Sequence, residues 1–160
     1  MASSTSLERG AACSIARTLG IVGERWSLLV VREAMKGRTR FSEFQDALRV
    51  STDILSHRFE GLVAAGIFER RPYREPGRRS RHSYHLTTTG LELLPVLAAL
   101  MQWGDAHLAG EPGPPALMRR RDTGAPVRVA FVDDDGQLVE PGDIEVVPGP
   151  GARASTAPAA

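Results

Sequence analysis

The chain has 160 residues, a formal net charge of +1 and a single cysteine. A hydrophobic fraction of 42% allows one globular domain with a short appendage, and the lone Cys13 excludes an internal disulfide or a cysteine-rich zinc site. The opening residues lack the apolar core of a signal peptide, and the longest apolar stretch, residues 93–101, is about half of the ~20 residues that a membrane span needs. We therefore expect a cytoplasmic protein with no membrane partner.

The small net charge conceals an uneven distribution. Residues 36–81 carry eleven Lys and Arg against six Asp and Glu, a net charge of +5, whereas residues 111–160 carry five Arg against eight acids, a net charge of −3. A basic middle segment beside an acidic tail indicates a polyanionic partner for the middle.

Helical periodicity begins after residues 1–12, which are small and polar and which we predict to be a flexible arm. From Cys13, apolar residues recur at spacings of four and three (Ile15, Leu19 and Val22), and Gly23 can end this helix. A second helix is predicted over residues 24–36, with acidic Glu24 at its start and Lys36 at its end, as the helix dipole favours.

Two further helices follow at short spacing. A short helix beginning near Phe41 has an apolar stripe, and Ser51 is a suitable N-cap for a helix over residues 52–65 that Gly66 terminates. This pair, separated by a few residues, is typical of a helix-turn-helix, in which the second helix enters the major groove of DNA.

After Gly66 the apolar period changes from helical to two. The pattern predicts strands over residues 67–73 and 80–86 around the turn at residues 75–77, with a basic tip. A long final helix is then predicted from the cap residues 87–89 to Gly110, with a bend at Pro95. Because residues 91–101 are apolar on nearly every side, we expect a second subunit to cover this helix.

The remainder of the chain is predicted to be a separate appendage. Residues 111–118 are a linker by composition, and residues 119–147 form a small β-hairpin, with strands near 127–131 and 144–147 and a turn at 133–136. Residues 148–160 are of low complexity and are predicted to be disordered. The predicted fold class is thus mainly α with a small β-hairpin wing (α+β): a dimeric winged helix-turn-helix domain over residues 13–110, with a long C-terminal dimerisation helix.

This fold predicts the residues that bind double-stranded DNA. Short side chains at Ser51, Thr52 and Ser56 allow close approach to the duplex, and His57 and Arg58 supply longer donors to base edges. Arginines near the hairpin tip would lie along the backbone or in the adjacent minor groove. The complete predicted set is Arg40, Ser51, Thr52, Ser56, His57, Arg58, Arg74, Arg78, Arg79 and Arg81.

Several linked motifs over about residues 13–107 resemble the HxlR-type regulators, relatives of the MarR group. They are Cys13, Gly23-Glu24-Arg25-Trp26, Arg40-Phe41-Ser42-Glu43-Phe44, Leu55-Ser56-His57-Arg58-Phe59, and residues 86–97. The resemblance implies a cytoplasmic homodimeric winged-helix regulator of a pseudo-palindromic operator, joined through its first and last helices, and we favour a repressor over an activator. The predicted dimer contacts are Ile15, Leu19, Leu94, Leu97 and Met101.

The resemblance also suggests what signal the protein receives. Several members carry a redox-responsive thiol at the position that matches Cys13, whereas others respond to small molecules. At a helix N-terminus the dipole favours thiolate, so Cys13 is a candidate redox switch, with a simple packing role as the alternative. Trp26 and Trp103 could likewise line an effector pocket, although core or dimer packing is the simpler interpretation.

Other chemistries find no support in the sequence. His82 and His85 have no carboxylate to complete a metal site, and the acidic run at residues 133–136 lacks the calcium-loop spacing. Phosphate-binding glycine loops, nucleophile elbows and zinc-protease helices do not occur, so we expect neither a metal, a cofactor nor an enzyme. The alternatives are a winged-helix adaptor that docks onto a protein and a small-molecule sensor that reads no DNA sequence directly.

Overall fold

The computed structural model describes residues 13–77, 79–108, 110–111 and 113–152. The predicted arm at residues 1–12, Arg78 and most of the predicted tail lie outside the described residues. The chain folds as two compact units, residues 1–97 and 98–160.

The first four helices among the described residues lie in the first unit, and the sequence predicted each of them. They are α2 (Ser14–Val22), α3 (Arg25–Met35), α4 (Phe41–Leu48) and α5 (Thr52–Ala64). The α4–α5 turn passes through Arg49, which has a left-handed backbone with φ of 50°. Ser51 then begins α5, since its hydroxyl accepts a hydrogen bond from the Ile54 N–H at 3.4 Å. The predicted helix-turn-helix is therefore present.

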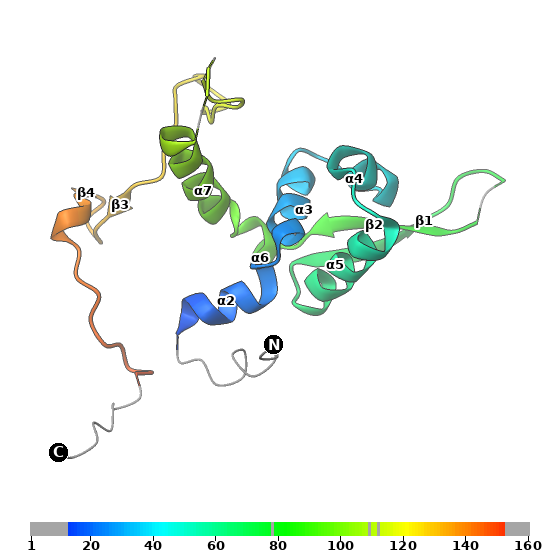
Figure 1. Cartoon of the computed structure of the whole chain (residues 1–160), viewed down its shortest axis with the longest axis horizontal. Helices are drawn as coiled ribbons and strands as arrows, with labels where there is room; N and C mark the ends of the chain where they lie inside the picture. Colours follow the sequence, from blue (N-terminus) through cyan, green and yellow to red (C-terminus); the bar gives the residue numbers. More distant parts are fainter. Residues whose placement is uncertain (1–12, 78, 109, 112, 153–160) are drawn as a thin grey trace. The chain divides into compact units, whose positions relative to one another are not determined.

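The hairpin wing consists of β1 (Phe68–Tyr73) and β2 (Arg81–Leu86), which pair antiparallel with Phe68 opposite Leu86 and Tyr73 opposite Arg81. On the other side of β2, the Tyr84 N–H donates to the Thr39 carbonyl at 2.7 Å. This makes β1 the outer strand, where Pro72 removes no needed hydrogen bond. Figure 1 shows the hairpin projecting beyond α4 and α5.

An aromatic cluster forms the centre of the core beneath the wing. Phe44, Phe59 and Phe68 are almost fully buried, and Phe59 lies 5.0 Å from Phe44 and 5.4 Å from Phe68 between ring centroids, edge to face. Tyr84 of the wing stacks on Phe59 at 3.8 Å. Because Phe59 belongs to α5, one side chain joins the second helix of the motif to α4 and to both strands of the wing.

The predicted final helix is divided in two. The structure has α6 (Thr88–Leu91), a turn at residues 92–93, and α7 (Leu94–His107). The prediction that Pro95 bends a continuous helix is wrong; Pro95 occupies the first turn of α7, where its missing N–H would have no intrahelical partner. The first of the two helices, α6, ends at Leu91, and a new helix begins around Pro95.

Gly90 explains how α6 approaches the start of the wing so closely. A β-carbon at Gly90 would lie 2.3 Å from the Ile67 carbonyl oxygen and 2.9 Å from Leu86 Cδ2. Thr87 fastens the same junction, because its hydroxyl accepts from the Gly90 N–H at 3.1 Å and donates to the Gly66 carbonyl at 2.5 Å. Only glycine fits between these backbone segments.

Substitution of this glycine is therefore expected to destabilise the domain. Gly90→Ala should lower the free energy of unfolding by about 1–3 kcal/mol, because backbone must move to admit the methyl group. Gly104→Ala is the matched control, since a β-carbon added at Gly104 would meet nothing within 4 Å and alanine favours the helix. Urea unfolding measures both; equal midpoints for the two variants would show that the close approach carries no energetic cost.

The second unit has little regular structure after α7. It contains β3 (Phe131–Val132) paired with β4 (Leu138–Val139), and the 3-10 turn η1 (Pro141–Asp143). The Asp133 carboxylate accepts from the Asp135 and Gln137 N–H groups and forms the predicted turn. The return strand lies at residues 138–139 rather than at residues 144–147, so the predicted position of that strand is wrong. The turn at Asp133 is tight, and it therefore pairs Phe131 and Val132 with the nearest apolar residues that follow it, Leu138 and Val139.

Candidate nucleic-acid interface

One face of α5 is buried and the opposite face is polar. Leu55, Phe59 and Leu62 fill the core, and the polar face presents Thr52 and His57 to solvent, with Ser56 half-buried. Two of the predicted side chains also have local structural roles: Ser51 caps the helix, and the Thr52 hydroxyl accepts from the Gln45 amide at 3.0 Å. Ile54, an apolar residue of the same helix, is 42% exposed. This face can therefore offer a methyl surface besides hydroxyl and imidazole groups.

Arg58 differs from the other predicted residues of α5. Its guanidinium lies 3.8 Å from the Glu24 carboxylate at the start of α3, and its side chain is only 21% exposed. Arg58 thus turns toward the body of the domain, where it connects α5 with α3, and His57 is the long polar side chain that is exposed on the outer face.

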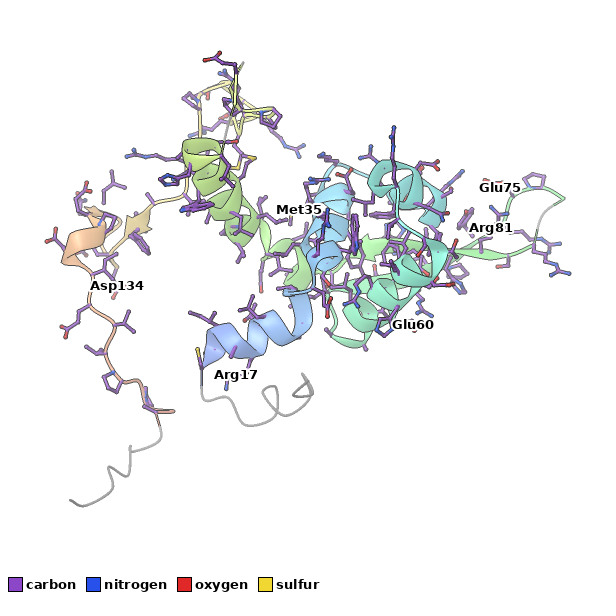
Figure 2. The ribbon with its side chains drawn as sticks, viewed as in Figure 1. Arg17, Met35, Glu60, Glu75, Arg81 and Asp134 are labelled. Carbon is purple, nitrogen blue, oxygen red and sulfur yellow. The ribbon has the colours of Figure 1, made fainter. Side chains whose placement is uncertain are left out.

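Arg40 joins the helix-turn-helix to the wing. Its guanidinium donates to the Glu75 carboxylate at 2.9 Å and lies 5.2 Å from the centroid of the Tyr73 ring. Figure 2 places both Glu75 and Arg81 on the wing. Of the other predicted wing arginines, Arg74, Arg79 and Arg81 are exposed, and Arg78 lies outside the described residues. The structure therefore gathers a cationic edge on the same hairpin that packs on α5 through Tyr84.

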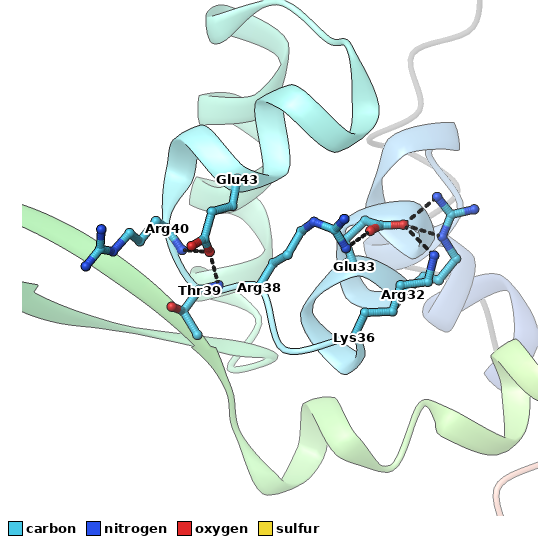
Figure 3. Close-up of polar contacts among 7 residues, drawn as sticks. All are labelled: Arg32, Glu33, Lys36, Arg38, Thr39, Arg40 and Glu43. Atoms are coloured by element: carbon cyan, nitrogen blue, oxygen red, sulfur yellow. Dashed lines mark hydrogen bonds and ion pairs between the residues drawn. The ribbon is translucent and has the colours of Figure 1, made fainter.

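A buried carboxylate with three cations lies at the end of α3 (Figure 3). Glu33 is 2% exposed, and its two oxygens accept from Arg32 at 2.8 Å, Lys36 at 3.1 Å and Arg38 at 2.5 Å. Burial alone would raise the pKa of Glu33, but the hydrogen bonds and charges of Lys36 and Arg32 outweigh it and lower the pKa below its usual value. The contact with Arg38 fixes the loop that leads to Arg40.

Glu33 was not among the predicted residues, although the sequence carries a signal for it. Glu33 lies three residues after Val30 and so on the same side of the predicted helix as this apolar residue, where a carboxylate needs cationic partners. Lys36 and Arg38 follow within five residues.

Glu43 fixes the entry to α4. Its carboxylate accepts from the backbone N–H groups of Thr39 and Arg40, both at 2.9 Å (Figure 3). These two hydrogen bonds lower the pKa of Glu43. The same segment pairs with β2 through the Thr39 carbonyl, so Glu33 and Glu43 together hold the loop between α3 and α4 against the wing.

The Glu33 cluster should make folding stability depend on acid. A carboxyl group whose folded-state pKa is lowered stabilises the protein fully above about pH 5, and this contribution is lost as the pH falls through the folded-state value. Glu33→Gln should therefore cost about 1–3 kcal/mol at pH 7 and less at pH 3. The control is Glu60→Gln, at an exposed position of α5. Urea unfolding at the two pH values tests this: a cost for Glu33→Gln that stays constant between them would contradict the expectation.

The predicted dimer contacts differ in accessibility. Ile15 and Leu19 on α2 are 70% and 55% exposed, and Leu94 on α7 is 52% exposed. Leu97 packs partly against the core of the first unit, and Met101 is half-buried. Cys13 is an exposed free thiol that directly precedes α2. Most of the predicted contacts are thus apolar side chains left open to solvent.

The described residues offer neither a cluster of metal ligands nor a membrane-spanning helix. Across the described ranges, no group of three or more His, Cys, Asp or Glu is placed to hold a metal ion. None of the helices in that part of the chain combines the length and the apolar character that crossing a membrane requires.

Comparison with known proteins places this geometry in a family. Residues 21–112 match the model of the HxlR-like helix-turn-helix family. The HTH-type transcriptional regulator Rv3095 of Mycobacterium tuberculosis is 37% identical over 145 residues, 90% of each chain. The crystal structure of PA1607, assigned as a transcription factor, superposes with a TM-score of 0.77 at 35% identity, covering 88% of this chain and 97% of PA1607.

More distant structural neighbours include redox regulators. The reduced form of the transcriptional regulator YodB from Bacillus subtilis has a TM-score of 0.52 at 28% identity, covering 63% of this chain and 97% of YodB. The redox regulator HypR in its reduced form has a TM-score of 0.54 at 25% identity, covering 59% of this chain and 92% of HypR. The family model covers more than half of the sequence and lies on the winged helix-turn-helix itself. The chain therefore belongs to the HxlR-like helix-turn-helix family of transcriptional regulators, related in structure to the MarR group, and is not an enzyme.

Proposed function

We propose that this protein is a sequence-specific regulator of transcription that binds double-stranded DNA as a homodimer, and that it represses rather than activates. One observation carries the proposal: the capped helix α5 has one face buried in the core and a polar face open to solvent, beside a wing with exposed arginines. A helix of this kind fits the major groove, and its N-terminal residues reach base edges.

Within this proposal the residues have different roles. Thr52 and His57 contact base edges, together with Ser51 at the cap, whereas the wing arginines and Arg40 bind phosphates. Arg58 acts through its ion pair with Glu24, which orients α5 on α3. When DNA binds, Arg40 exchanges its carboxylate partner Glu75 for a phosphate, because carboxylate and phosphate oxygens bind the same guanidinium group.

Dimerisation is proposed through α2 and α7. Each helix exposes large apolar side chains, among them Ile15 and Leu19 on α2 and Leu94 and Trp103 on α7. Exposed apolar surface of this extent marks an interaction site. A second copy of the chain supplies a matching apolar surface by symmetry. The resulting dimer also places two copies of α5 at the spacing of successive major grooves.

Selection from a random-sequence duplex library tests the proposal. The purified protein should enrich a two-fold symmetric sequence, and light scattering should give twice the mass of one chain. Enrichment of no sequence at low ionic strength, or a strictly monomeric protein, would refute it. Retention of a protein partner without any duplex would favour the adaptor alternative.

Oxidation of Cys13 is the signal we propose to test first, because the thiol is exposed and redox regulators occur among the structural neighbours. Peroxide or diamide should change the affinity of the wild-type protein for its selected duplex by about tenfold, as typical allosteric coupling energies allow. Cys13→Ser should bind like the reduced wild type under both conditions. Equal effects of oxidant on wild type and variant would exclude Cys13 as the sensor.

A further inference from the structure

A cleft lies between the helix-turn-helix and the wing. It has a volume of about 360 Å³, and its lining comes from the start of α4, the middle of α5 and both strands of the wing. Phe41 and Tyr84 form aromatic walls, and the polar groups come from Ser42, Ser56, Tyr73, Arg81 and His82. Two serine hydroxyls from different helices thus face the same space as the first residues of β2.

Four of the polar side chains that line this cleft have no hydrogen-bonding or ionic partner among the described residues. In the part of the chain that the structure describes, Ser42, Ser56, Arg81 and His82 make no side-chain hydrogen bond or ion pair. The neighbouring arginines, in contrast, already have carboxylate partners, because Arg40 is paired with Glu75 and Arg38 with Glu33. Four potential donors from three elements therefore converge on a cavity without satisfying one another.

The charge of the cleft favours an anion. Arg81 carries a full positive charge, the His82 ring offers an N–H donor, and no Asp or Glu is among the described residues that line the cavity. Hydroxyl and guanidinium donors are the groups that proteins use for phosphate oxygens. A volume of 360 Å³ also leaves room for the deoxyribose next to a phosphate.

We propose that this cleft binds one phosphodiester group of the DNA backbone, with Ser42, Ser56 and His82 as hydrogen-bond donors and Arg81 as the cation. The inference rests on the proposed function and refines it, because it assigns Ser56 to the backbone instead of a base edge. Since the donors come from α4, α5 and β2, a single phosphate fixes the angle between the recognition helix and the wing on the duplex.

Single substitutions test the assignment on the duplex recovered by selection. Ser42→Ala and Ser56→Ala should each weaken binding about 5–10-fold, by the same factor for matched and mismatched duplexes, with an unchanged salt dependence. Arg81→Ala should in addition reduce the slope of log K against log salt by about 1, and Arg81→Lys should restore that slope.

Ser83→Ala is the matched control on β2. Its hydroxyl donates to the Arg71 carbonyl at 3.1 Å and does not line the cleft, so this variant should bind like wild type. Thermal unfolding of every variant identifies any loss of affinity that comes from misfolding, and Ser56→Ala provides the second variant if Ser42→Ala proves unstable.

Duplexes with single methylphosphonate substitutions locate the phosphate. One position in each half-site should weaken wild-type binding but have no further effect on Ser42→Ala or Ser56→Ala, because the contact is already lost. A change of base preference in Ser56→Ala, or equal sensitivity of wild type and variants at every phosphate, would overturn the assignment. If wild type binds no duplex, the proposed function fails; if wild type binds and the serine variants bind equally well, only the phosphate seat fails.

Discussion

Phe59→Ala is expected to remove about 3–5 kcal/mol from the free energy of unfolding, a large part of the roughly 5–15 kcal/mol that a domain of this kind possesses. The ring is fully buried and contacts the aromatic rings of Phe44, Phe68 and Tyr84. Its removal leaves a cavity at the junction of α4, α5 and the wing, which the packed backbone cannot close. The variant should therefore also lose DNA binding near physiological temperature.

Urea and thermal unfolding measure the loss. Phe131→Ala is the matched control, because it removes the same ring from a side chain that is 57% exposed in the second unit. That variant should unfold within about 0.5 kcal/mol of wild type, as surface substitutions usually do. Similar midpoints for the two variants would mean that the aromatic cluster is not the centre of the core.

Local patterns predicted the helix-turn-helix because its elements are determined by neighbours in sequence. The 3.6-residue apolar period of α3 and α5, the Ser51 cap and the two-residue alternation of the wing each act over a few residues. The close packing of α6 on the start of the wing was not predictable in this way. It depends on Gly90 lying against the Ile67 carbonyl, a contact between distant positions of the sequence that no periodicity records.

The candidate interface shows the same limit. The sequence gathers basic residues on one hairpin and short polar residues at one helix start, and the structure has them on neighbouring elements. The sequence does not reveal that Arg40 is paired with Glu75, 35 residues away, or that Arg58 forms an ion pair with Glu24. Ion pairs between distant positions depend on tertiary packing, so a count of arginines overestimates the charge that is free for DNA.

The wing should therefore be tested by its effect on salt dependence. Replacement of both Arg78 and Arg79 by alanine, directly after the turn at Gly77, is expected to weaken duplex binding roughly 100-fold at moderate salt, since each lost phosphate contact costs about 1.4 kcal/mol or more. The slope of log K against log salt should fall by about 1.8, because two counterions fewer are released. The loss should be equal for matched and mismatched duplexes, since phosphate contacts carry no base information.

Two arginines of the second unit give the control for total charge. Arg119 and Arg121 lie on the appendage, and their replacement by alanine changes the net charge by the same amount. If the wing binds phosphates directly, this control should keep the wild-type slope. A loss of slope shared by both double variants would mean that the overall field of the protein, and not contact by the wing, attracts the duplex. Because His57 on α5 remains intact in the wing variant, the base preference of this variant should stay that of the wild type. The comparison thus separates the strength of binding from the recognition of sequence.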